Sequence, residues 1–121
     1  MILRIKKEKL REGVSIAERI SSKSFSLPIL KNIVIRAHKN LVNISATDLE
    51  VGLDWWSLAK VEEEGEVVVP ASIISGFITF LPDEVITLSS SSNNLKVECG
   101  DFKTQINGFP PDDFPIIPNI S

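Results

Sequence analysis

The chain has 121 residues, a formal net charge of −3 and 43% hydrophobic residues, values typical of one globular domain with its own core. No apolar run approaches the roughly 20 residues that a membrane-spanning helix needs. The amino terminus places its apolar residues before its charges, the reverse of a secretory signal. We therefore expect a cytoplasmic protein with no membrane partner. Cys99 is the one cysteine of the sequence, which excludes an internal disulfide and argues against a cysteine-based metal site.

The charge is distributed unevenly along the chain. Residues 1–40 contain ten Lys and Arg against three Glu, a net charge of +7, whereas residues 41–121 contain three against thirteen acids, a net charge of −10. A basic segment on an acidic body indicates one face for a polyanion and another face that repels it. The alternative is an unevenly charged surface that is merely solvated, and charge alone leaves both interpretations open.

Taken in chain order, the hydrophobic periodicity predicts the same unit twice, a strand and a helix followed by three strands. The first unit occupies residues 2–5, 8–20, 33–37, 42–47 and 51–56. The second unit occupies residues 67–69, 70–81, 85–88, 95–99 and 102–106. Pro70 suits the first turn of the second helix, and a polar turn is expected from Ser89 to Asn94. The run from Glu62 to Gly65 is predicted to be the turn that joins the halves.

Two such units can lay their helices side by side against two antiparallel sheets, which predicts a layered α+β domain. Five short strings then occur in order along nearly the whole chain. They are LPILKN at 27–32, ATDLE at 46–50, VPA at 69–71, LPD at 81–83 and GFPPDDFP at 108–115. With these strings the sequence resembles the amino-terminal domain of the bacterial DNA polymerase III beta subunit, the sliding clamp.

The resemblance implies the DNA clamp fold, in which each domain is a pseudo-twofold pair of these units. In that family three domains make a subunit, and two subunits close a ring whose helices line the hole. Residues 1–121 then correspond to the first domain, and residues 110–121 begin the linker to the second. The implied function is that of a polymerase processivity factor without cofactor or catalysis. The implied partners are duplex DNA, the replicative polymerase, an ATP-dependent clamp loader and a second clamp subunit.

A clamp that slides needs weak, non-specific contacts to phosphates rather than base readout. The residues that we expect to face phosphates lie on the first helix and in the loop after it. They are Lys7, Arg11, Arg19 and Lys23. The alternative for each is ordinary solvation. The second helix departs from the family pattern, because its exposed positions Ser72, Ser75, Gly76 and Thr79 carry no positive charge.

Apolar residues outside the predicted core indicate interfaces with other domains or subunits. Trp56 faces outward if its neighbour Trp55 is in the core, because successive strand residues point to opposite sides. Ile73 and Phe80 fall off the apolar stripe of the second helix. The resemblance adds Lys103, Thr104 and Ile106 on the last strand. The alternative is that loops of the domain itself bury these residues.

Catalytic and metal-binding patterns are weak in this sequence. His38 is the one histidine, and Asp48 at a strand end is the kind of residue that orders a turn. A hydrolase that uses either residue needs a paired second group, which the sequence does not indicate. The acidic run at 62–66 is interpreted as a solvated hairpin tip rather than a metal site. The alternative function that stays open is a stand-alone clamp-fold interaction module that does not encircle DNA.

Overall fold

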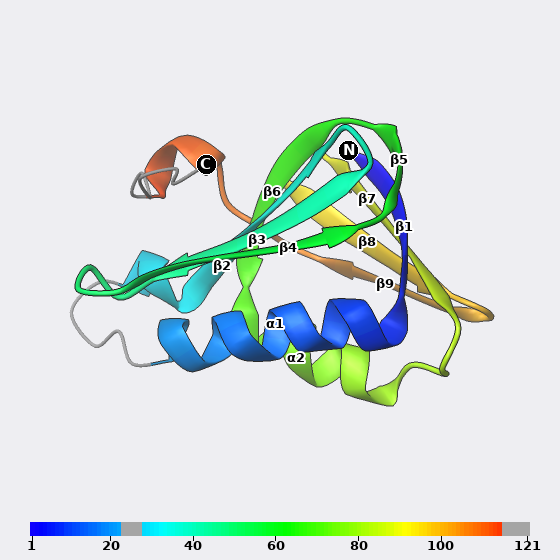
Figure 1. The fold of residues 1–121 in the computed structure, drawn as a ribbon, viewed down its shortest axis with the longest axis horizontal. Helices are drawn as coiled ribbons and strands as arrows, with labels where there is room; N and C mark the ends of the chain where they lie inside the picture. The colour runs from blue at the N-terminus through cyan, green and yellow to red at the C-terminus, as the bar shows by residue number, and fades with distance from the viewer. Residues whose placement is uncertain (23–27, 115–121) are drawn as a thin grey trace.

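The computed structural model describes residues 1–22 and 28–114, and in it two antiparallel sheets cover a layer of two helices (Figure 1). The strands are β1 (Ile2–Lys6), β2 (Asn32–His38), β3 (Leu41–Thr47), β4 (Gly52–Leu58), β5 (Lys60–Glu63), β6 (Gly65–Pro70), β7 (Val85–Ser91), β8 (Asn94–Cys99) and β9 (Phe102–Ile106). The helices are α1 (Lys7–Ser21) and α2 (Ala71–Phe80), with short 3-10 turns η1 (Pro28–Lys31) and η2 (Pro111–Asp113). This is the α+β architecture that the periodicity predicts.

The two halves exchange their first strands. One sheet has the order β5-β1-β7-β8-β9 and the other β4-β3-β2-β6. Strand β1, which opens the first unit, therefore pairs with β7 of the second, and β6, which opens the second unit, pairs with β2 of the first. All of these pairs are antiparallel. The exchange makes the repeat a pseudo-twofold pair, with α1 and α2 lying side by side beneath the sheets (Figure 1).

The predicted turn between the halves, Glu62 to Gly65, is wrong at both ends, because Gly65 is already the first residue of β6. Glu62 and Glu63 belong to β5, which pairs with β1, and only Glu64 separates β5 from β6. Residues 60–63 form a strand and not a turn because Val61 can pack on the core while the glutamates stay exposed. Ala59 alone connects β4 to β5, and its N–H donates to the carbonyl oxygen of Asn40 at 3.1 Å. The chain thus crosses from one sheet to the other over a single residue.

Two other boundaries also differ from the prediction. Pro70 is the last residue of β6 and precedes α2 in an extended conformation, rather than lying in its first turn. Strand β7 continues to Ser91, so the turn to β8 shrinks to Ser92 and Asn93. Both turn residues have positive φ, 51° and 71°, a conformation that asparagine tolerates better than most residues.

The main core lies between the helix layer and the sheets. Its largest fully buried side chains come from both helices and both sheets, among them Leu3, Leu10, Ile35, Ile44, Ile74 and Ile86. A second, smaller cluster lies on the other face of β2 and β6, where Phe114 covers Val34 and Val68. A backbone hydrogen bond from Phe109 to the carbonyl oxygen of Val68, at 3.0 Å, holds the segment after β9 against the edge of β6.

A close approach between α1 and β4 depends on a glycine. A Cβ atom on Gly13 would lie 2.5 Å from Cε3 of the Trp55 ring, a separation that atoms in proteins do not reach without rearrangement. Gly76 lies inside α2 as Gly13 lies inside α1, but a Cβ atom on Gly76 would meet nothing within 4 Å. The first glycine is therefore required by packing, whereas the second is not.

These two glycines give a matched test of the packing. We expect Gly13→Ala to lower the free energy of unfolding by about 1–3 kcal/mol, the usual cost of overpacking. Gly76→Ala should raise it by about 0.5–1 kcal/mol, because alanine is the better helix former. Urea denaturation followed by circular dichroism measures both. A Gly13→Ala variant as stable as Gly76→Ala would contradict the packing of α1 on Trp55.

Candidate nucleic-acid interface

The flank of α1 that faces α2 holds the first of the predicted cations. Lys7 is partly buried, and its Nζ donates a hydrogen bond to the carbonyl oxygen of Leu81, just beyond α2, at 2.5 Å. Near the other end of α1, Glu18 accepts a hydrogen bond from the Ser75 hydroxyl at 3.1 Å. Lys7 therefore ties the two helices together, and this contact competes with the phosphate-facing role expected for it.

The outward face of α1 holds two of the predicted cations. Arg11 is exposed and forms an ion pair with Glu8 at 3.2 Å. Arg19 is exposed, and no carboxylate of the described residues lies within ion-pair distance of it. Lys23 lies outside the described residues. Of the four predicted residues, the structure thus leaves Arg11 and Arg19 on the open face of the helix layer.

This open face carries little net charge. Glu8 and Glu12 are exposed on α1 together with Arg11 and Arg19. On α2 the exposed polar positions are uncharged, as the sequence indicates, and Thr79 donates to the carbonyl oxygen of Ser75 at 3.0 Å. A surface with balanced charges attracts phosphates weakly and loses that attraction readily in salt.

The predicted interface residues lie on three elements, β4, α2 and β9. Trp56 is 50% exposed on β4, an edge strand. Ile73 and Phe80 are 55% and 82% exposed on α2. On β9, the edge strand of the other sheet, Lys103 is exposed and Thr104 half-buried.

Ile106 is a correction to this set. Its side chain is 5% exposed and belongs to the main core, because the last residue of β9 turns inward. Six further large apolar residues of the described chain are exposed and were not expected from the sequence, among them Leu58 on β4 and Phe102 on β9. Alternation from Trp56 would have placed Leu58 on the outer side. Phe102 shares a strand face with Ile106 by the same alternation, yet it is exposed, so alternation alone does not predict its exposure.

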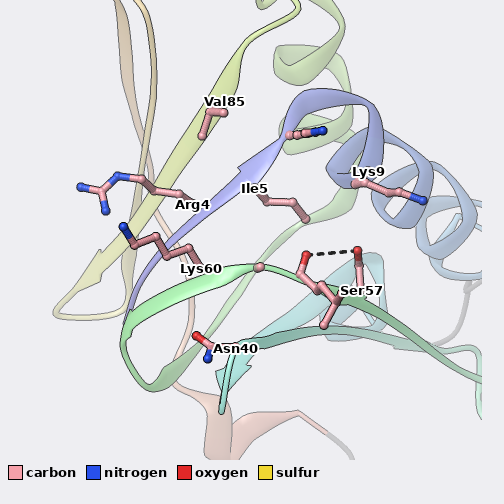
Figure 2. A pocket seen from close by; sticks show the side chains of 10 residues that line it. Arg4, Ile5, Lys9, Asn40, Ser57, Lys60 and Val85 are labelled. Carbon is pink, nitrogen blue, oxygen red and sulfur yellow. Dashed lines mark hydrogen bonds between the residues drawn. The ribbon is translucent and has the colours of Figure 1, made fainter.

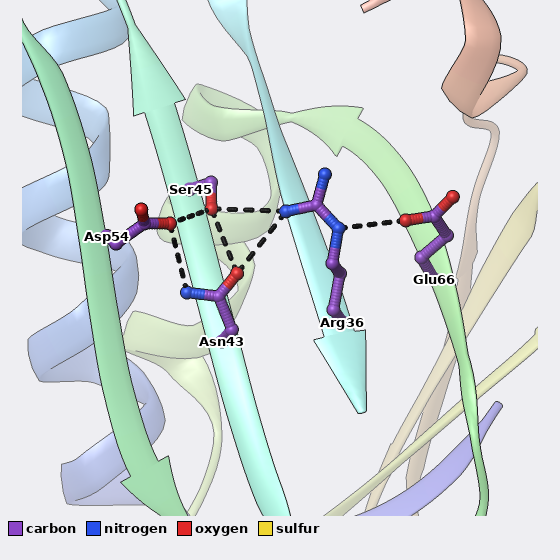
Figure 3. Close-up of polar contacts among 5 residues, drawn as sticks. All are labelled: Arg36, Asn43, Ser45, Asp54 and Glu66. Atoms are coloured by element: carbon purple, nitrogen blue, oxygen red, sulfur yellow. Dashed lines mark hydrogen bonds and ion pairs between the residues drawn. The ribbon is translucent and has the colours of Figure 1, made fainter. Parts of the chain in front are cut away.

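A polar network crosses the outer face of the second sheet (Figure 3). Arg36 donates from Nε to Glu66 at 2.9 Å and from Nη1 to the side-chain oxygens of Asn43 and Ser45 at 3.3 and 3.2 Å. Asn43 and Ser45 are buried and also bond to Asp54. The network joins β6, β2, β3 and β4 and satisfies buried polar groups, which is a structural role.

The residues considered for hydrolysis do not form a site. His38 Nδ1 lies 2.7 Å from a Glu64 carboxylate oxygen, and both side chains are exposed at the hairpin end. Asp48 Oδ1 accepts hydrogen bonds from the N–H groups of Glu50 and Val51, at 2.9 and 2.7 Å, so it orders a turn as expected. The antiparallel register pairs His38 with Leu41, which places Asp48 at the opposite end of β3.

Metal ligands and a reactive thiol are also missing from the described part of the chain. No group of three His, Cys, Asp or Glu side chains there is arranged to hold a metal ion. Burial raises the pKa of the Cys99 thiol, and the nearby Glu84 carboxylate raises it further. The thiol therefore stays protonated near neutral pH and behaves as a core side chain.

No helix in residues 1–22 and 28–114 is long and apolar enough to cross a membrane.

Comparison with known proteins decides the family. The family profile described as DNA polymerase III beta subunit, N-terminal domain, matches residues 1–118. The chain belongs to this family. The beta sliding clamp of Synechocystis is 31% identical over 122 residues, which cover 92% of this chain and 31% of that protein. The chain thus spans about one third of the length of the curated relatives it matches.

Solved beta subunits share the fold over nearly the whole chain. The DNA polymerase III subunit beta of Pseudomonas aeruginosa superposes with a TM-score of 0.91 at 26% identity, covering 98% of this chain and 33% of that one. The Caulobacter crescentus beta sliding clamp gives a TM-score of 0.91 at 26% identity, with 99% and 32% covered. The clamp fold predicted from the five strings is confirmed.

The network around Arg36 gives a test of what stabilises this clamp domain. We expect Arg36→Met to lower the free energy of unfolding by about 1–3 kcal/mol, because buried side-chain oxygens of Asn43 and Ser45 lose a donor. The matched control Arg11→Met breaks an exposed pair and should cost about 0.5 kcal/mol or less. Urea midpoints of the two variants measure the difference. Equal midpoints would show that the network does not stabilise the sheet.

Proposed function

We propose that the chain acts as the amino-terminal domain of a ring-shaped sliding clamp, a non-catalytic processivity factor of a replicative DNA polymerase. The observation that carries the proposal is the match of residues 1–118 to the family, together with a TM-score of 0.91 to solved clamps. Because the chain covers about one third of these relatives, the ring needs further domains. The polymerase and an ATP-dependent loader would be partners of that complete ring.

The helix layer supports a sliding role. A clamp retains DNA by enclosing it, so its contacts must be weak enough to move along the backbone. Arg11 and Arg19 supply positive charge on the open face, whereas Glu8 and Glu12 oppose it. In this proposal Arg11 and Arg19 touch phosphates briefly, and Lys23 is a further candidate from the sequence.

The edge strand β9 supports the contact with a second clamp subunit. An edge strand presents unpaired backbone groups that another sheet can extend. Phe102 on β9 and Phe80 on α2 are 52% and 82% exposed, and Ile73 adds apolar surface on the same helix. Lys103 and Thr104 would then lie at the rim, with Ile106 contributing its backbone alone. Trp56, on the edge strand β4 of the other sheet, is proposed to meet a neighbouring domain.

A second candidate function is an interaction module with the clamp fold that does not enclose DNA. The uncharged outer face of α2 favours it, because that helix offers no cation for phosphate contact. The two functions differ in whether the open helix face binds duplex DNA at all.

Salt titration of duplex binding separates the two functions. We expect the chain to bind a short duplex weakly at low salt, with affinity that falls steeply as salt rises. Arg11→Gln combined with Arg19→Gln should flatten the dependence of log affinity on log salt by about 1.8, since each phosphate that a cation neutralises adds about 0.9 to the slope. Fluorescence anisotropy of a labelled duplex measures the slopes.

The matched control is Lys31→Gln combined with Lys96→Gln, which removes two exposed cations from other surfaces. That control should leave the slope unchanged. No binding by the unmodified chain at low salt would favour the interaction module. An equal change of slope in both double variants would remove Arg11 and Arg19 from the proposed contact.

The mass of the native protein in its source cells tests the ring. We expect an antibody raised against this chain to detect, on a denaturing blot, a band near three times 13.4 kDa, since three domains of this size make a clamp subunit. A band at 13.4 kDa would mean that a ring requires several separate copies, and the interaction module would then be favoured.

A further inference from the structure

A cleft opens where the chain passes from β4 to β5, beside β1 and the first turn of α1 (Figure 2). Its volume is about 1010 Å³. The residues that line it come from separate parts of the sequence. They are Arg4, Ile5, Lys6, Lys9, Asn40, Ser57, Leu58, Ala59, Lys60 and Val85.

The cleft is strongly basic. Four of its lining side chains are cations and none is a carboxylate. Arg4 forms an ion pair with Glu62 on the adjacent strand. Lys6, Lys9 and Lys60 are exposed, and no carboxylate of residues 1–22 or 28–114 lies within ion-pair distance of them. Three positive charges therefore line one space without a carboxylate partner in the described chain.

The strand register places two of these cations against each other. Arg4 on β1 lies directly opposite Lys60 on β5, and Figure 2 shows their side chains next to one another. Like charges directly opposite in an antiparallel pair are destabilising, and Glu62 offsets only part of this charge. An anion bound beside Lys60 would reduce this repulsion, which supports an acidic ligand.

The position of Lys9 separates this cleft from the open helix face. Lys9 lies one turn before Gly13, the residue of α1 that packs on Trp55 of β4. Residues four apart share a helix face, so Lys9 lies on the β4 side of α1. Lys7, by contrast, lies on the α2 side, where it contacts Leu81. The cleft therefore shares no cation with the surface proposed to contact DNA.

The walls of the cleft are apolar, which narrows the class of ligand. Leu58 and Val85 are 79% and 50% exposed, and Ile5 and Ala59 complete the apolar lining. A phosphate group has no apolar surface to bury on such walls, whereas a peptide can place apolar side chains between its carboxylates. Strands β4 and β5 are also edge strands of their sheets, and an extended peptide can hydrogen-bond to such an edge.

We propose that this cleft binds an acidic peptide segment that carries apolar side chains between its carboxylates. The apolar side chains would pack on Leu58 and Val85, and the carboxylates would pair with Lys9 and Lys60. The proposal does not rest on the ring, because it needs only the described domain and uses none of the residues assigned to duplex binding.

Titration of the chain with a fluorescein-labelled Asp-Asp-Leu-Phe-Asp-Asp peptide tests the proposal. We expect saturable anisotropy that weakens as salt is added. Two matched peptides separate the contributions, one with Asn in place of every Asp and one with Ser in place of Leu and Phe. Both should bind at least about tenfold more weakly, because each lacks one of the two kinds of interaction.

Variants of the protein locate the site. Lys9→Glu combined with Lys60→Glu should weaken binding by about tenfold, as two exposed ion pairs become repulsions. Lys31→Glu combined with Lys96→Glu changes the net charge equally on other surfaces and should leave the affinity within about twofold. Leu58→Ser, at an exposed position that should not disturb folding, tests the apolar wall and should also weaken binding.

Three outcomes would overturn the proposal. They are no binding of the acidic peptide, equal weakening in both charge-reversal variants, or displacement of the peptide by a single-stranded oligonucleotide that binds more tightly. Failure here is distinguishable from failure of the clamp function, because duplex binding depends on Arg11 and Arg19. Duplex binding should therefore persist when Lys9 and Lys60 are reversed.

Discussion

The pairing of β1 with β7, and of β6 with β2, is the constraint on which the rest of this domain depends. Each half begins with a strand that completes the sheet of the other half. A helix follows each exchanged strand without an intervening residue, since β1 ends at Lys6 and β6 at Pro70. The ladders therefore fix where both helices start, and their side-by-side layer follows from that. The open face proposed to line a DNA channel is a product of this exchange.

Much of this fold could be predicted from periodicity, and the exceptions have physical causes. The helices and eight strands carry regular apolar patterns that one sequence reveals. Strand β5 lacks such a pattern, because Val61 is its one apolar residue and its pairing partner is β1, about 60 positions earlier. Ile106 is buried where it pairs with the buried Leu95 of β8, a register that the resemblance to a family did not specify.

The site was less predictable than the fold, because its contacts join distant segments. Lys7 is held by the carbonyl oxygen of Leu81, and a backbone acceptor leaves no trace in the side-chain sequence. The cations that line the basic cleft come from β1, α1 and β5. In the sequence they are simply members of the basic segment and one later lysine, and nothing there shows that they lie together. The cations of the basic segment are thus shared between two surfaces. On the helix face they are almost balanced by glutamates, and in the cleft they are in clear excess.

The single residue between β4 and β5 has a mechanical consequence. The N–H of Ala59 donates to the carbonyl oxygen of Asn40, and its side chain packs on the core. The connection between the two sheets therefore has no unconstrained residue. A displacement of β4 would pass directly into β5 and from there into β1 and α1. In any assembly made from this domain, we expect this corner to bend less than the contacts between domains.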